Sequence, residues 1–484
     1  MPAASHDHTV HFVSLGCPKN RVDTECMLGS LRVARYQHVD DPRDADVIVV
    51  NTCAFLRSSI EESLATVLEH AAYKEEGRCK KLVVAGCLTQ RYPGELAQML
   101  PEVDHFLGTS EYTKIAEVLA DGAGRELVSE PRYVHDAQTP KVVSTAPRGY
   151  AYLKVAEGCS RRCSFCIIPK LRGLQQISRP LDDVVAEARQ LAAAGIHELN
   201  LVAQDLTAYG RDLAGAGRGG GGGDVAGAVA GDGNGGRAAR LTELLRAVAA
   251  VPGIRWTRCL YAYPENFPEE LIHTLRDTPG VARYLDMPLQ HVSDPVLRAM
   301  RRGHGGDRVR KLVERIRTLA PEVTLRTTFI VGFPGETDAD FRQLCDFVRE
   351  MQFDRVGVFR YSREEGTEAH DLAAQVPARV KSARFRELMK LQKQISRERW
   401  KAWVGRECDA LVEGPSDDHA YVYAARLESQ APEVDGVVYL TDAGAARPGQ
   451  MARVRITRAG DYDLVGEVVG PSTQRLKAST TVSA

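Results

Sequence analysis

'EGCSRRCSFCIIP', residues 157–169, places three cysteines on one short stretch: Cys159, Cys163 and Cys166. Thiolates this close together can hold a single metal centre. A structural zinc site closes with four Cys or His ligands, and ferredoxin-type clusters have C-x2-C-x2-C spacing with a further cysteine. The residues that follow, 'IIPKLRGLQQISRP', contain no fourth Cys or His. The spacing therefore favours a [4Fe-4S] cluster with one iron left open for a substrate or cofactor.

Around this stretch, apolar and amphipathic segments alternate as in a βα repeat. Six runs read as strands: 'YAYLKVAEG', 'ELNLVAQD', 'RWTRCLYAYP', 'YLDMPLQH', 'TLRTTFIVGFPGE' and 'RVGVFRYS'. Six strands within residues 149–390 predict a partial or full α/β barrel, whose chemistry lies at the carboxyl ends of its strands. Residues 213–240 interrupt the series, and twelve of these 28 residues are Gly. We expect a flexible surface insertion there, because such a segment buries too little apolar surface to offset its ordering entropy.

The first hundred residues contain three further strand-like runs, and each ends close to a cysteine. They are 'TVHFVSLGC' with Cys17, 'ADVIVVNTC' with Cys53 and 'KKLVVAGC' with Cys87. Ligands bind beyond the carboxyl ends of the strands in an open α/β sheet, so neighbouring strands would bring these thiols together. We predict an N-terminal parallel-sheet βα domain over 8–125, followed by a Pro-containing linker over 126–148.

After a charged helical segment, the C-terminal region changes to short alternating runs such as 'AYVYAARL' and 'MARVRITRA', separated by Gly, Pro and Asp. This pattern predicts a small antiparallel, OB-like β-barrel over 400–471, with a tail over 472–484. The fold class is therefore α/β with a small β-barrel at the end.

Composition sets the cellular context. The chain has 484 residues, 44% hydrophobic and 26% charged, as expected for about three domains without a membrane span. Its start lacks the basic and apolar regions of a secretory signal, so we expect a cytoplasmic protein with reduced thiols. Eleven cysteines then indicate metal binding or catalysis. Five lie outside the motifs, and we expect them to be structural: Cys26, Cys79, Cys259, Cys345 and Cys408. The histidines are scattered without ligand spacing.

The C-x3-C-x2-C run resembles that of the radical S-adenosylmethionine (SAM) enzymes, in which SAM itself chelates the open iron. The resemblance implies that one electron from the cluster cleaves SAM to a 5′-deoxyadenosyl radical. It also implies that Phe165 packs beside SAM and that Gln204 and Asp205 contact its amino end. The alternatives are a core aromatic for Phe165 and a helix cap for the polar pair. 'IVGFPGE', residues 330–336, resembles another segment near the cofactor, although a tight turn explains its glycines almost as well.

Nearly the whole chain, apart from the glycine insertion, resembles the radical SAM methylthiotransferase family. That family joins a three-cysteine N-terminal domain, a radical SAM barrel and a C-terminal barrel called TRAM. The resemblance implies that Cys17, Cys53 and Cys87 hold a second [4Fe-4S] cluster, whose open iron binds a sulfide or polysulfide for transfer. The alternative is that these three are buried structural thiols.

Local motifs separate the two bacterial branches of this family. 'SLGCPKN', 'QDLTAYG', 'LYAYP', 'YLDMPLQH' and 'APEVDGVVYL' resemble the branch that modifies an aspartate β-carbon in small-subunit ribosomal protein twelve. The tRNA-modifying branch tends to carry Gln-Met-Asn after the first cysteine and Gln-Asn in place of Gln204-Asp205. The resemblance implies that the partners are this ribosomal protein or the small subunit, and an electron donor such as flavodoxin or ferredoxin. One departure is 'LRGLQQISRP', slightly longer than the usual spacing.

The charge of the C-terminal region bears separately on the choice between a protein and a tRNA substrate. Residues 405–470 contain twelve Asp or Glu against six Arg and no Lys, a formal balance of −6. Such a domain would repel the phosphates of tRNA and suit a basic ribosomal protein, unless its charge is simply a solvated surface. The remaining alternatives are methylthiolation of a tRNA adenosine beside the anticodon and a non-catalytic Fe-S scaffold on the ribosome.

Overall fold

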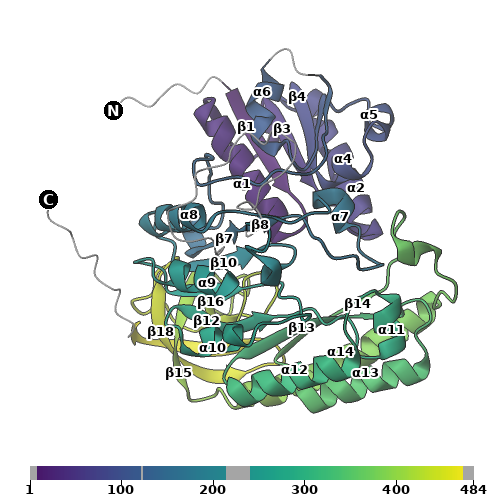
Figure 1. Cartoon of the computed structure of the whole chain (residues 1–484). Helices are drawn as coiled ribbons and strands as arrows, with labels where there is room; N and C mark the ends of the chain where they lie inside the picture. Colours follow the sequence, from purple (N-terminus) through teal and green to yellow (C-terminus); the bar gives the residue numbers. More distant parts are fainter. Residues whose placement is uncertain (1–7, 121–123, 214–239, 473–484) are drawn as a thin grey trace.

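The computed structural model describes residues 8–120, 124–213 and 240–472, which form three units in chain order. In Figure 1 the purple N-terminal unit lies above the teal and green second unit, and the yellow C-terminal strands lie beside the second unit. The predicted insertion at 213–240 and the predicted tail at 472–484 lie outside the described residues, apart from the residues at their edges.

The N-terminal unit is built on a six-stranded parallel sheet in the order β2-β1-β3-β4-β5-β6. Its strands are β1 (His8–Ser14), β2 (Tyr36–His38), β3 (Val47–Thr52), β4 (Lys81–Gly86), β5 (His105–Leu107) and β6 (Glu126–Leu127). Its helices are α1 (Pro18–Val33), α2 (Arg57–Ala71), α3 (Tyr73–Glu76), α4 (Cys87–Arg91), α5 (Glu95–Met99) and α6 (Ile115–Leu119).

Both faces of this sheet are covered, which explains why its strands are continuous apolar runs. Val47 and Val49 of β3 pack on the α1 and α6 side, whereas Ile48 and Val50 pack on the α2 side. Residues 126–148, expected as a linker, begin with β6, which extends the first sheet. Farther along this segment Ser144 donates two hydrogen bonds to the buried carboxylate of Glu25 in α1.

The second unit contains the six strands that the sequence predicts. They form an open parallel sheet in the order β14-β13-β12-β11-β10-β7, which is a partial barrel. The strands are β7 (Tyr150–Lys154), β10 (Glu198–Val202), β11 (Trp256–Cys259), β12 (Val281–Asp286), β13 (Thr324–Val331) and β14 (Arg355–Arg360), with a separate ribbon of β8 (Ala156–Glu157) and β9 (Ile177–Ser178). The helices are α7 (Ile168–Arg172), α8 (Leu181–Ala193), α9 (Leu241–Ala249), α10 (Glu269–Asp277), α11 (Asp294–Ala299), α12 (Gly306–Leu319), α13 (Asp338–Met351) and α14 (Ala378–Lys401).

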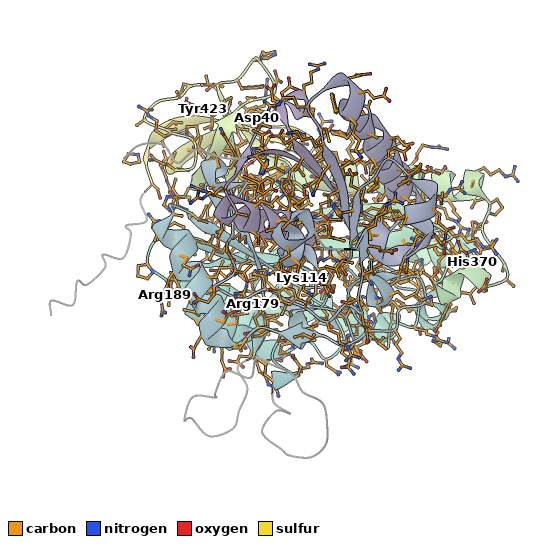
Figure 2. The ribbon with its side chains drawn as sticks, turned by 90° about the horizontal axis from the view of Figure 1, so that it is seen from above. Asp40, Lys114, Arg179, Arg189, His370 and Tyr423 are labelled. Atoms are coloured by element: carbon orange, nitrogen blue, oxygen red, sulfur yellow. The ribbon has the colours of Figure 1, made fainter. Side chains whose placement is uncertain are left out.

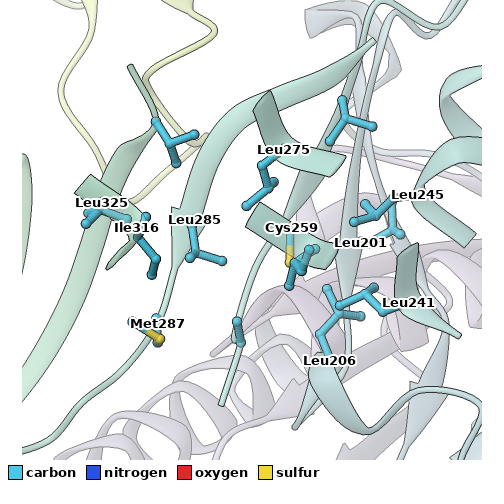
Figure 3. Packing of buried hydrophobic residues seen from close by; sticks show 14 of the residues in the cluster. Leu201, Leu206, Leu241, Leu245, Cys259, Leu275, Leu285, Met287, Ile316 and Leu325 are labelled. Carbon is cyan, nitrogen blue, oxygen red and sulfur yellow. The ribbon is translucent and has the colours of Figure 1, made fainter. Parts of the chain in front are cut away.

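The core of the second unit lies between this sheet and its helices. Figure 3 shows Cys259 of β11 among Leu201, Leu275 and Leu285, and Cys259 is fully buried in this apolar cluster. Cys259 is therefore a core residue. Seen from above, the N-terminal unit overlies the rest, and Arg189 of α8 and His370 lie toward opposite edges of the view (Figure 2).

The C-terminal unit is a closed five-stranded barrel in the order β15-β16-β17-β19-β18. Its strands are β15 (Glu407–Pro415), β16 (Tyr423–Leu427), β17 (Val438–Leu440), β18 (Met451–Ala459) and β19 (Leu464–Pro471). Four of the five pairings are antiparallel, as predicted, but β17 and β19 pair in parallel. Strand direction cannot alternate around a closed ring with an odd number of strands, so one parallel pairing is required.

A buried ionic network fixes this barrel to the second unit. Glu198 of β10 accepts from Arg426 of β16 at 2.6 Å and from Arg258 of β11 at 2.9 Å, and all three side chains are buried. Tyr284 donates to Asp435 across the same interface at 2.7 Å. Among the described residues no helix is both long and apolar enough to cross a membrane.

Candidate metal centre and cofactor site

The three N-terminal cysteines follow three adjacent strands. Cys17 lies three residues after β1, Cys53 directly follows β3, and Cys87 begins α4 directly after β4. Gly16 has a φ of +92°, and a Cβ there would lie 2.8 Å from Cβ and 3.0 Å from Sγ of Cys53. Only glycine lets the Cys17 loop approach Cys53 this closely.

These thiols differ in exposure. Cys17 is exposed, Cys53 is partly buried and Cys87 is buried. Burial raises the pKa of Cys87 to about 12, and the nearby positive charge of Arg172 only partly opposes this effect. The guanidinium Nη2 of Arg172 donates to Sγ of Cys87 at 3.5 Å. A metal bound to the sulfur would favour the Cys87 thiolate near neutral pH.

Cys159, Cys163 and Cys166 lie on the loop between β8 and α7. The Cys159 N–H donates to the carbonyl of Gly173 at 3.0 Å, which ties the start of the loop to the end of α7, and the Cys166 N–H donates to the carbonyl of Cys163 at 3.1 Å, which closes a turn within the loop. Gly158 has a φ of +84°, and a Cβ there would lie 2.2 Å from the carbonyl oxygen of Gln175. The chain therefore enters the loop through a turn that only glycine fits.

Burial also disfavours the charged form of two thiols in this second set. It raises the pKa of Cys159 to about 11 and that of Cys166 to about 12, and the neighbouring Cys163 acts in the same direction. Arg302 donates from Nη1 to Sγ of Cys163 at 3.5 Å. Each set of three thiols thus has one arginine beside a sulfur atom.

Asp205 is ion-paired with the cysteine loop. Its Oδ2 accepts from Nε of Arg161 at 2.8 Å, and its Oδ1 accepts from the hydroxyl of Thr207 at 2.6 Å. It makes no side-chain hydrogen bond to the backbone of the following turn, so it does not act as a cap there. The Arg161 guanidinium also lies 4.0 Å from the ring centroid of Tyr263.

Gln204 and Phe165 lie in different surroundings. Gln204 donates from its amide to Glu157, while its buried Oε1 has no hydrogen-bond partner among the described residues. Phe165 is partly buried and packs edge-on against Phe333 at 6.5 Å between ring centroids. In 'IVGFPGE' the Glu336 carboxylate accepts from the Phe333 N–H at 3.0 Å, which ties that turn together.

A buried ionic network lies between Cys87 and the residues that flank the barrel cysteine loop, and the sequence did not reveal it. Arg172, the last residue of α7, donates to Asp23 of α1 at 2.6 Å as well as to Cys87. Lys154 of β7 contacts both Asp23 and Glu157, the latter at 2.7 Å. One sequence signal could have revealed this network: the run 'YLKVAEG' contains a Lys and a Glu among apolar residues. Charged side chains that are buried in a strand need partners of opposite charge.

The other cysteines take no part in either set. Cys26, Cys79, Cys259 and Cys345 are buried and Cys408 is partly buried, and all eleven cysteines are free thiols. No three His, Cys, Asp or Glu side chains within the described ranges are arranged to share one metal ion. A cluster of four irons and four sulfides is wider than a single ion, so its ligands stand farther apart.

Two hollows lie near the ends of the second sheet. One, of about 410 Å³, adjoins the cysteine loop and is lined by Ser160, Arg161, Gln175, Gln176, Asp205, Ala208, Arg211 and Asp212. The other, of about 380 Å³, lies at the amino ends of β11 and β12 beside Trp256 and Val281. The second hollow is at the wrong end of the strands for the chemistry expected of such a barrel.

Three family models match the chain. Residues 9–108 match the Uncharacterized protein family UPF0004, residues 153–348 match the Radical SAM superfamily, and residues 404–469 match the TRAM domain. The three matches correspond to the three units of the structure.

Curated relatives extend over nearly the full chain. The ribosomal protein uS12 methylthiotransferase RimO of Sorangium cellulosum is 54% identical, covering 95% of this chain and 91% of the relative. The enzymes of the same name from Myxococcus xanthus and Geobacter sulfurreducens are 48% and 47% identical, each over 95% of this chain and over 92% and 98% of their own lengths. The chain belongs to the RimO family. All six cysteines described above therefore lie in a RimO-family chain matched over almost its whole length.

A solved structure agrees with this assignment at the level of the fold. The radical SAM methyltransferase TsrM from Kitasatospora setae, with cobalamin and a [4Fe-4S] cluster bound, aligns with a TM-score of 0.52 at 16% identity. The alignment covers 75% of this chain and 74% of TsrM. Identity this low shows only that this RimO-family chain shares the TsrM fold.

Proposed function

We propose that this protein is a radical SAM methylthiotransferase that adds a methylthio group to the β-carbon of an aspartate in ribosomal protein uS12. The observation that carries the proposal is the connection between the two sets of cysteines, because Arg172 follows the barrel cysteine loop and also contacts Cys87. Relatives with the uS12 methylthiotransferase name support the substrate. Nothing in these comparisons favours a tRNA adenosine or a non-catalytic scaffold.

Cys159, Cys163 and Cys166 would hold a [4Fe-4S] cluster that leaves one iron for SAM. When bound, the cluster and SAM supply the radical that removes hydrogen from an unactivated carbon. The chain's own groups fit SAM, since the unpartnered Oε1 of Gln204 is an acceptor for its ammonium group. Asp205 would act beside it, and Phe165 would pack against the cofactor.

Cys17, Cys53 and Cys87 would hold the second [4Fe-4S] cluster and present sulfur to the substrate. Their position at the ends of adjacent strands and the exposure of Cys17 support this role, because a sulfur-delivering site has to be reached from solvent. We propose domain bounds of 8–125, 149–390 and 400–471 around these two centres. The reductant would be a protein such as flavodoxin or ferredoxin, and a ribosomal substrate would place the enzyme in the cytoplasm.

The acidic charge of the C-terminal barrel is weaker evidence for a basic protein substrate than the composition of residues 405–470 suggests. Seven of its twelve acidic residues are ion-paired with Lys or Arg: Glu407, Asp409, Glu413, Glu433, Asp435, Asp461 and Glu467. Pairs to the rest of the chain, such as Asp435 with Arg326, fix the barrel in place. Of these seven, only Glu433, Asp435 and Asp461 pair with cations outside the barrel, and these three pairs make the charge left to attract a basic partner smaller than the formal balance.

The test is a single-turnover assay of the anaerobically reconstituted protein with SAM and a strong reductant. Ribosomal protein uS12 should gain the mass of one methylthio group on its aspartate, and 5′-deoxyadenosine should form in the same tube. A parallel reaction with unmodified tRNA should leave the nucleosides unchanged. A methylthiolated adenosine with unmodified uS12 would overturn the proposal in favour of the tRNA reading.

A further inference from the structure

Lys19 of α1 reaches from the N-terminal unit to the barrel. It lies two residues after Cys17, and its ammonium lies 3.5 Å from the ring centroid of Tyr261, in the loop that follows β11. The residue is only 8% exposed. The two residues come from 'SLGCPKN' and 'LYAYP', which are far apart in the sequence.

The Lys19 ammonium has no hydrogen-bond acceptor and no carboxylate partner within the described part of the chain. Its ring contact there is with Tyr261, and Cys17, Glu157 and Asp286 act on it electrostatically without a hydrogen bond. An ammonium has three N–H donors, and burying it without acceptors costs free energy. A cation–π contact stabilises a desolvated ammonium by about 2 kcal/mol, which offsets only part of that cost. Solvent, or a partner that is not part of the chain, would supply the missing acceptors.

The two nearest carboxylates already have other partners. Asp286 accepts from Arg326 at 2.9 Å and from the Tyr261 N–H at 3.2 Å. Glu157 is shared between Lys154 and Gln204, with Lys154 at 2.7 Å. Both favour the charged form of Lys19 electrostatically, but neither accepts a hydrogen bond from it.

The ring under the ammonium is held in an unusual conformation. Tyr261 has a φ of +61°, in the left-handed region that costs a residue other than glycine on the order of 1–3 kcal/mol. Its N–H donates to Asp286, and its carbonyl accepts from the Leu206 N–H at 3.1 Å. These bonds hold the backbone of Tyr261 in the conformation that carries the ring beside Lys19.

We infer that Lys19 binds the carboxylate of the substrate aspartate. The inference rests on the proposed function and deepens it by naming the group that recognises the target side chain. An aspartate carboxylate supplies both a negative charge and acceptors to the ammonium, whereas a neutral adenine supplies acceptors without the charge. The reacting β-carbon is bonded directly to the carboxylate carbon, so holding the carboxylate beside Cys17 fixes the β-carbon near the first set of cysteines.

The test compares two peptides on the reconstituted protein with SAM and without reductant, so that binding is measured without turnover. One is the uS12 loop peptide with its aspartate, and the other carries asparagine at that position. The wild type should bind the aspartate peptide more tightly by roughly tenfold or more, as expected for a charge-assisted hydrogen bond. Lys19→Met should bind both peptides equally, with the affinity that the wild type has for the asparagine peptide.

Lys19→Arg keeps the charge and should keep a preference for aspartate. Lys311→Met, on the exposed face of α12, is the matched control and should behave as wild type. An unchanged ratio of the two affinities in Lys19→Met would overturn the inference. An equal loss for both peptides would also overturn it, since that outcome indicates a structural role.

Iron content and the absorption spectrum of Lys19→Met separate a role in holding the N-terminal cluster from a role in binding substrate. Loss of iron with an unchanged ratio of affinities would assign Lys19 to the cluster and overturn the inference.

Methylthiolation of the aspartate peptide by wild type, after reductant is added, separates the two proposals. If wild type modifies the peptide and the ratio is insensitive to Lys19, only the inference fails. If wild type neither binds nor modifies it, the proposed function fails, and the inference fails with it.

Discussion

At the scale of single residues, the six motif cysteines form two sets whose proposed roles can be separated by mutation. Changing Cys17, Cys53 and Cys87 together to Ala should halve the iron content and abolish methylthio transfer while leaving reductive SAM cleavage, because Cys159, Cys163 and Cys166 remain. The measurement is 5′-deoxyadenosine and substrate mass in one reaction. Cys408→Ala removes a thiol outside both sets and should retain both activities. Methylthio transfer by the triple variant would contradict the sulfur-delivery role.

Asp46 gives a prediction about pH. The residue is buried, which opposes its ionisation, but hydrogen bonds from Thr9 and Lys80 outweigh burial and lower its pKa to about 2. Since this lies below the unfolded value of 3.8, the stabilisation is fully present above pH 3.8 and is lost as the pH falls toward 2. Asp46→Asn should cost about 2 kcal/mol near neutral pH.

Urea unfolding of the metal-free protein between pH 7 and pH 2 measures this effect. The difference between wild type and Asp46→Asn should shrink over the acidic part of that range. Asp40→Asn, at an exposed position on the same unit, is the control and should track wild type throughout. A difference that stays constant down to pH 2 would show that Asp46 stabilises the fold by something other than its charge.

At the scale of elements, helix α7 is the direct connection between the two centres. It begins two residues after Cys166 and ends at Arg172, which contacts Cys87. We expect Arg172→Met to lower the reduction potential of the N-terminal cluster, because removing a nearby positive charge disfavours adding an electron. A shift on the order of 60 mV corresponds to about 1.4 kcal/mol for one electron.

An EPR-monitored redox titration of the reconstituted protein measures this shift. Arg172→Lys keeps the charge and should shift the potential less than Arg172→Met does. The potential of the barrel cluster should move less than that of the N-terminal cluster, since Arg172 touches Cys87 directly. Equal shifts of both clusters would mean that Arg172 acts on the fold as a whole.

At the scale of the whole molecule, the C-terminal barrel depends on the buried Glu198, Arg258 and Arg426 network. Glu198→Ala leaves two buried guanidinium groups without their carboxylate and should destabilise the protein by about 3–5 kcal/mol. Urea unfolding followed by tryptophan fluorescence measures this, because Trp400 packs in the core of that barrel. Glu407→Ala removes an exposed pair to Arg455 and should cost less than about 1 kcal/mol. Similar costs for the two variants would contradict the role of the network.

The sequence alone determined the local chemistry and the order of elements. Cysteine spacing predicted the loop of Cys159, Cys163 and Cys166, and apolar runs predicted the six strands of the second sheet, because strand periodicity and ligand spacing are local properties of the chain. The relatives and the family models confirm the predicted family, and the five-stranded barrel confirms the predicted third unit apart from its one parallel pairing. The ligand roles of the cysteines, and the roles of Phe165, Gln204 and Asp205, stay predictions.

Only the tertiary structure decided which distant charges meet. Arg172 beside Cys87 and Lys19 on Tyr261 join segments that no sequence pattern relates. The acidic composition of 405–470 was a poor guide to its surface, since many of its carboxylates are ion-paired within the chain. Burial and pairing depend on how the units pack against one another, and a buried charge acquires its partner only when that packing forms.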